Sequence, residues 1–180
     1  NNCYNYACNK PTYSFAVPGR AGGYVPASGW VKYVLNPSPP PRLKPVATVI
    51  TDSERTFHPT DLITCTVVVA AAKADGLLYL GTDCSQDCPL GTHKMALVVR
   101  PTPMRDFHWY REDTDGTWSH KPGGANATNR SKVKDPGEDT PDTIDSVDEV
   151  ERDAASAPGL YTVPCGCFCA SNDPQAVKKE

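Results

Sequence analysis

The sequence predicts an α+β domain in which a short N-terminal helix packs on an antiparallel sheet. Three observations indicate this class. Asn2 is a favourable N-cap for a helix that starts near Cys3 and ends by Pro11. Met95–Val99 is the most apolar run of the chain and predicts a central strand. Asp106–Lys121 is rich in aromatic residues on either side of an Asp-Gly turn, which is typical of a β-hairpin.

The remaining elements follow from local patterns. Thr60 caps a second helix that runs to about Ala74. Strands are expected at 77–80 and, from Leu160–Val163 together with Phe168, in the cysteine-rich C-terminal end. We expect one domain over residues 1–172, with a mobile acidic loop at about 124–158 and a frayed tail at 173–180. The loop is expected because Lys134–Asp153 carries nine acids against two bases.

Composition excludes several classes of function. The formal charge of −3 and the lack of a basic stripe argue against nucleic acid as a partner. No run of 18 apolar residues exists, so no membrane span is expected. We expect a monomer without a cofactor. Eight cysteines and two N-glycosylation sequons, at Asn126 and Asn129, favour a secreted or extracytoplasmic protein.

The C-terminal cysteines predict disulfides rather than a metal site. Cys165, Cys167 and Cys169 alternate along the chain, a spacing that suits zinc poorly because a strand would crowd all three on one face. We therefore expect no metal. The partners expected for these three are Cys84, Cys88, and either Cys65 or Cys8.

The predicted hairpin carries a histidine on each arm. With a loop centred near Thr114, His108 and His120 lie opposite each other on one face of the sheet. A strict two-residue turn at Asp115-Gly116 pairs His120 with Arg111 instead, so the register depends on the loop.

Cys3 is the candidate nucleophile. A thiol in the first turn of a helix is near unpaired N–H groups that lower its pKa, and an imidazole lowers it further. Asn2 would stand beside it as an oxyanion donor, with the Cys3 backbone N–H as a second donor. The alternative, equally open, is that Cys3 forms a disulfide.

A cysteine that opens a helix, followed by a strand histidine and a third polar residue, resembles the papain-like cysteine peptidases. NlpC/P60 and CHAP amidase domains are most similar in size and order, and Cys3-Tyr4 after Asn2 also resembles the nucleophile segment of ubiquitin-specific proteases. The motifs Cys-Tyr-Asn-Tyr-Ala, Phe-His-Trp-Tyr-Arg and Trp-Ser-His-Lys-Pro-Gly resemble a further family that brings no known activity.

The papain-like resemblance implies a papain-like fold with Cys3 as nucleophile, His108 as base and His120 orienting it. It also allows His93 as base with His108 as third member. Pairing His108 with Val98 places His93 roughly 16 Å away along the strand, which favours the first arrangement.

Two functions are expected from different classes. The first is a thiol-dependent hydrolase, a peptidase or amidase, that cleaves a peptide, protein or cell-wall amide and binds it with Trp109, Trp118 and Arg111. The alternative is a secreted, disulfide-stapled binding or effector protein without catalysis, with all eight cysteines paired and the Trp-rich hairpin as its contact surface.

Overall fold

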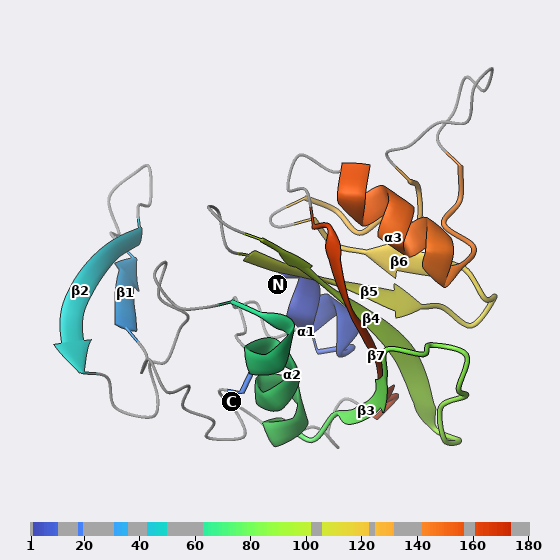
Figure 1. The fold of residues 1–180 in the computed structure, drawn as a ribbon, viewed down its shortest axis with the longest axis horizontal. Coiled ribbons are helices and arrows are strands. Elements are labelled where there is room, and N and C mark those ends of the chain that lie inside the picture. The colour runs from blue at the N-terminus through green and yellow to red at the C-terminus, as the bar shows by residue number, and fades with distance from the viewer. Residues whose placement is uncertain are drawn as a thin grey trace.

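In a computed structural model, the structure describes residues 2–10, 18–19, 31–35, 43–49, 63–101, 106–122, 125–131, 142–156 and 161–173, with backbone only for 31–35 and 43–49. The helices are α1 (Cys3–Ala7), α2 (Cys65–Ala74) and α3 (Val147–Ser156). The strands are β1 (Val31–Leu35), β2 (Leu43–Val49), β3 (Leu78–Gly81), β4 (Thr92–Arg100), β5 (Asp106–Glu112), β6 (Trp118–His120) and β7 (Val163–Ser171) (Figure 1).

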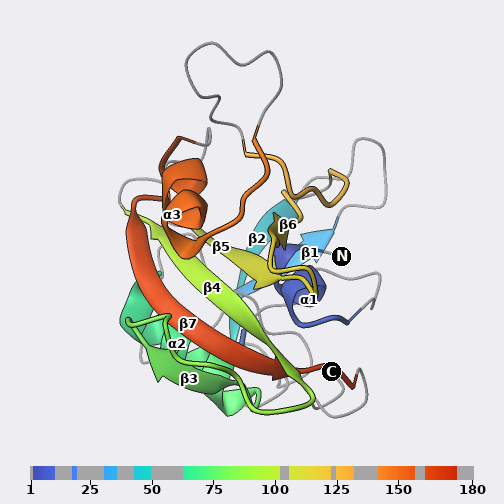
Figure 2. The same cartoon turned by 90° about the vertical axis from the view of Figure 1, so that its right-hand side faces the viewer.

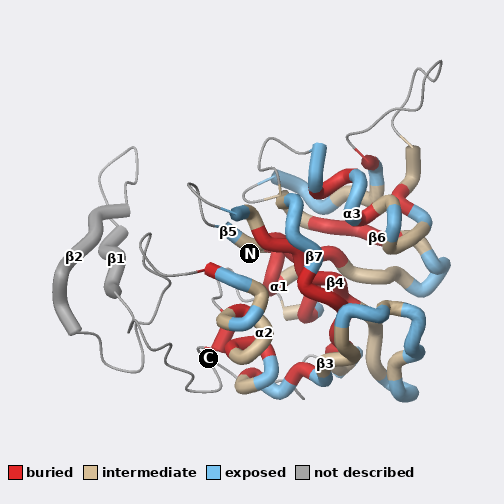
Figure 3. Tube along the Cα trace, in the orientation of Figure 1, coloured by how far each residue is buried: buried red, intermediate tan, exposed pale blue. Residues whose placement is uncertain are grey.

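The dominant element is an antiparallel five-stranded sheet in the order β3-β7-β4-β5-β6, while β1 and β2 form a separate two-stranded sheet. Strands β7, β4 and β5 lie side by side in Figure 2. The middle of β4 and of β7 is buried, as Figure 3 shows. The prediction that Met95–Val99 is a central strand is therefore confirmed.

The predicted α+β, papain-like class is wrong, because the described fold is β-rich. Its helices are short, and α1 has only five residues. Asn2 does cap α1, but the helix ends at Ala7 rather than near Pro11, so it cannot form the helical layer that the prediction required. Among the described helices, none has the length and apolar character needed to cross a bilayer.

Each face of the sheet has its own core. On one face, residues of α1 and α2 pack against Leu97, Trp109 and Phe168. On the other face, Val150 and Ala154 of α3 pack against alternate residues of the same strands. The alternation follows from the two-residue period of a strand, which sends neighbouring side chains to opposite faces.

Helix α3 lies within the segment predicted to be a mobile acidic loop. Its acids Asp148 and Glu151 are exposed, whereas Val150 and Ala154 are fully buried together with Ile144 just before the helix. These apolar residues recur at helical spacing, so burying one stripe stabilises the helix in spite of the many charges. Of the predicted tail at 173–180, residues 174–180 lie outside the described part of the chain.

Three disulfides join β7 to other parts of the chain. They link Cys65 to Cys165, Cys84 to Cys167 and Cys88 to Cys169. The prediction that the C-terminal cysteines form disulfides is confirmed.

The expected crowding of one face is avoided by an irregularity at Gly166, which has φ +98°. The register between β4 and β7 shifts there. As a result Cys165 belongs to the core beneath α1 and α2, and Cys167 to the core beneath α3.

Candidate functional site

The two hairpin histidines meet, although the predicted register is wrong. Tyr110, not His108, lies opposite His120, because a loop at Asp113–Thr117 connects the strands. Since this differs from the expected pairing by two residues, His108 stays on the same face. His108 Nε2 lies 2.8 Å from His120 Nδ1, and both rings are buried.

A buried carboxylate completes this cluster. Asp153 of α3 is fully buried, and its Oδ2 accepts a hydrogen bond from the Tyr110 hydroxyl at 2.7 Å and lies 3.9 Å from His120 Nε2. Its Oδ1 accepts from Ser131 at 3.3 Å. The His120 ring stacks on Tyr110 with an interplanar angle of 8°. Burial, followed by the charge of Asp153, raises the pKa of Tyr110 far above its usual range. This arrangement can hold His108 and His120 in fixed orientations.

Cys3 is not cross-linked, but it lacks the electrostatics of a nucleophile. The side chain is buried and belongs to the core beneath α1 and α2. Burial raises the pKa of the thiol from 9.0 to about 12, and the charge of Asp106 adds to this, while the backbone of Trp109 opposes it. The expectation of a lowered pKa fails because a five-residue helix gives little dipole to offset desolvation.

The other predicted catalytic residues have structural roles. Asn2 accepts a hydrogen bond from the Asn5 backbone N–H at 3.0 Å, so its side-chain oxygen caps α1. His93 lies between two groups: its Nε2 is 2.6 Å from the Ala7 carbonyl oxygen, and its Nδ1 is 2.8 Å from Oδ1 of Asn172.

The predicted substrate-binding residues divide into two groups. Trp109 is 0% exposed and Trp118 2%, so both are core residues and cannot stack on a ligand. Arg111 is half-buried at the surface, where its guanidinium lies 4.7 Å from the centroid of the Tyr6 ring. The expected Trp-rich contact surface is therefore absent from the described hairpin, whereas Arg111 lines a groove.

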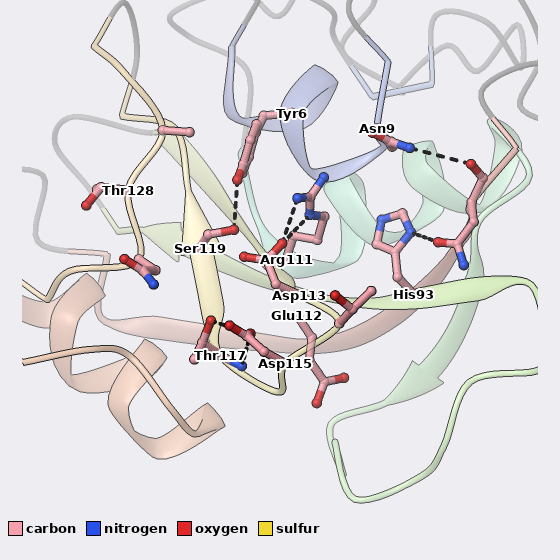
Figure 4. Close-up of a pocket in the computed structure, with 14 residues that line it drawn as sticks. Tyr6, Asn9, His93, Arg111, Glu112, Asp113, Asp115, Thr117, Ser119 and Thr128 are labelled. Carbon is pink, nitrogen blue, oxygen red and sulfur yellow. Dashed lines mark hydrogen bonds and ion pairs between the residues drawn. The ribbon is translucent and has the colours of Figure 1, made fainter.

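We call this groove the hairpin groove. It has a volume of about 660 Å³ and lies between α1, the β5–β6 hairpin and the start of β4 (Figure 4). It is lined by Tyr6, Asn9, His93, Arg111, Glu112, Asp113, Thr114, Asp115, Thr117, Ser119, Ala127, Thr128, Asn129 and Asn172. Most of these side chains are polar, so the groove can make many hydrogen bonds but offers little apolar surface.

Sequence reasoning missed both Asp153 and the groove. Asp153 is an acid on the apolar stripe of α3, beside Val150 and Ala154, and that position was the available signal for a buried carboxylate. The groove is assembled from segments far apart in the chain, so no local pattern could indicate it. Within the described ranges, no three His, Cys, Asp or Glu side chains gather as a metal site would need.

Together, the fold and the site define a disulfide-stapled, β-rich protein. Three disulfides are typical of an oxidising compartment, so the prediction of a secreted or extracytoplasmic protein is confirmed. The chain is 34% identical over 137 residues to "Insoluble matrix shell protein 1" of Ruditapes philippinarum. The match covers 76% of this chain and 65% of that protein, so the chain spans less than two thirds of its relative. No family model matches the chain, and no solved structure matches it.

These findings overturn the assignment as a hydrolase of the cysteine peptidase or amidase type. The relative is by name a matrix protein, and the thiol of Cys3 stays protonated at neutral pH. The alternative prediction, a disulfide-stapled protein, is correct in that disulfides are present. Its expectation that all eight cysteines are paired is wrong, because Cys3 and Cys8 are free and six cysteines are cross-linked.

Proposed function

We propose that the chain is a non-catalytic binding protein of an extracellular matrix. The observation that carries this proposal is the set of three disulfides that tie β7 to α2 and to the segment after β3. Cross-links of this kind preserve a fold outside the cell, where no reductant or chaperone maintains it.

Two further observations support the proposal. The likeness to an insoluble matrix shell protein extends over three quarters of this chain. In addition, the hairpin groove provides a polar surface large enough for a ligand. The Cys3 thiol, which a cysteine hydrolase would need as its nucleophile, is buried and protonated.

The test is retention on insoluble extracellular materials. Oxidised protein is incubated with cellulose, chitin, fibrillar collagen and calcium carbonate, and the bound fraction is measured against protein concentration. We expect saturable retention on at least one material. Retention on none would contradict the proposal, as would turnover of a peptide or amide substrate that Cys3→Ala abolishes.

A further inference from the structure

The hairpin groove is lined by groups that both donate and accept hydrogen bonds. Side-chain amides come from Asn9, Asn129 and Asn172, and hydroxyls from Thr117 and Thr128. A hydroxyl or amide satisfies a ligand that is itself a donor and an acceptor. Sugar hydroxyl groups have this property along the whole length of a polysaccharide.

Arg111 lines the groove and is held in place by neighbouring side chains. The ring of Tyr6 lies against its guanidinium, and the hydroxyl of Tyr6 is fixed at 2.8 Å from that of Ser119. Asp113 accepts from Arg111 Nε at 3.0 Å and from Nη2 at 2.6 Å. Within the described part of the chain, these contacts use two of five N–H donors and leave the others for a ligand. A donor fixed in advance loses little conformational entropy on binding.

The charges of the groove disfavour an anionic ligand. Asp113 neutralises Arg111, so an anionic polymer gains little from the guanidinium and is opposed by Glu112 and Asp115. These carboxylates do not oppose a cationic segment, so the choice of a neutral ligand rests on the amides and hydroxyls of the lining, and an oligolysine is the comparison that tests it. The carboxylate of Asp115 already accepts hydrogen bonds from the hydroxyl and the backbone N–H of Thr117, which lower its pKa.

We propose that the hairpin groove binds a neutral polysaccharide, with Arg111 as its central donor. The volume of about 660 Å³ lies in the range of about 300–1,000 Å³ typical of ligand sites and accommodates a short stretch of sugar units. This inference rests on the proposed function, because it names the matrix component that the protein contacts.

The experiment measures affinity for soluble chito- and cello-oligosaccharides by calorimetry, with heparin and an oligolysine as charged comparisons. We expect one of the neutral oligosaccharides to bind, and Arg111→Ala to weaken that binding by about tenfold or more. The control is Arg152→Ala, which should leave binding unchanged. It removes an exposed arginine of α3, the helix that packs on the other face of the sheet.

A second measurement uses the unaltered protein and so does not depend on the folding of a variant. In ¹H–¹⁵N spectra of the intact protein, the oligosaccharide should shift the amide signals of Ser119 and Thr128 and not those of α3. Tighter binding of heparin or oligolysine, or equal binding by Arg111→Ala, would overturn the inference. Retention on collagen or mineral with no oligosaccharide binding would overturn it too, while leaving the proposed function intact.

Discussion

At the scale of the residue, burial decides what Cys3 and Cys8 can do. Both thiols are buried, and desolvation is the largest cause of the raised pKa of each. The negative charge of Asp106 also raises the pKa of Cys3, and that of Asp75 raises the pKa of Cys8. The two thiols are therefore protonated components of the core rather than reactive groups.

We expect both thiols to alkylate slowly in the native protein. With iodoacetamide at pH 8, mass spectrometry should find Cys3 and Cys8 largely unmodified, and both should react fully once urea unfolds the chain. A rapid adduct at Cys3 alone in the folded protein would restore the case for a nucleophile.

The same thiols predict a pH dependence of stability. Because the pKa of Cys3 rises from 9.0 to about 12 on folding, its contribution to stability is complete below pH 9 and is lost as pH rises toward 12. The free energy of unfolding should therefore fall over this range. In Cys3→Ala the fall should be shallower, which urea titrations at several pH values would measure.

A third residue-scale prediction concerns two tyrosines that donate to carboxylates. Tyr110→Phe removes a donor from the fully buried Asp153 and should cost about 1–3 kcal/mol of stability. Tyr161→Phe is the matched control, because its acceptor Asp106 is exposed and water can replace the hydroxyl. That change should cost within about 0.5 kcal/mol. Equal losses in chemical denaturation would contradict this account.

At the scale of the element, β7 depends on its irregularity at Gly166. A Cβ there would overlap the carbonyl oxygen of Gly81 on β3, and the backbone has φ +98°. Gly166→Ala should cost more than about 3 kcal/mol, because both the strand pairing and the neighbouring disulfides must shift.

Gly116 provides the comparison for this prediction. It also has positive φ, but a Cβ would meet open space. Gly116→Ala should therefore cost only about 1 kcal/mol, the strain of the backbone alone. Thermal melts of the two variants separate the steric clash from the conformational strain.

The element scale also shows what the sequence could predict. The His108–His120 contact was expected from a register that proved wrong, yet the histidines still meet because an error of two residues keeps the face. Cysteine alternation indicated disulfides but not their individual partners. The many acids around α3 indicated a solvent-exposed loop, although Val150 and Asp153 are buried. The side chains that pack against them come from strands distant in the sequence.

At the scale of the whole molecule, the disulfides hold the five-stranded sheet together. Each spans 81 to 100 residues, and closing a loop of that length restricts the unfolded chain strongly. Replacing the pair Cys88 and Cys169 by Ser should lower stability by about 2–5 kcal/mol, measured by denaturation under oxidising conditions. An unchanged stability would show that packing alone maintains β7.

The prediction of the fold class was wrong because it depends on contacts across the whole molecule. Local patterns indicated individual helices and strands, but the fold class depends on how many residues of the fold are helical and how many are in strands. The fold is β-rich because α1 has only five residues, whereas the five-stranded sheet contains strands from residues 78 to 171. Long-range strand pairing leaves no mark in any single window of sequence.

The order of the bridges along the chain has one more consequence. Cys65, Cys84 and Cys88 all precede the long middle stretch, and their partners at 165, 167 and 169 all follow it. A protease that cleaves the backbone once between Cys88 and Cys165 therefore leaves two fragments that are still joined by three disulfides. Such a clipped molecule would migrate as one species until a reducing agent released its halves.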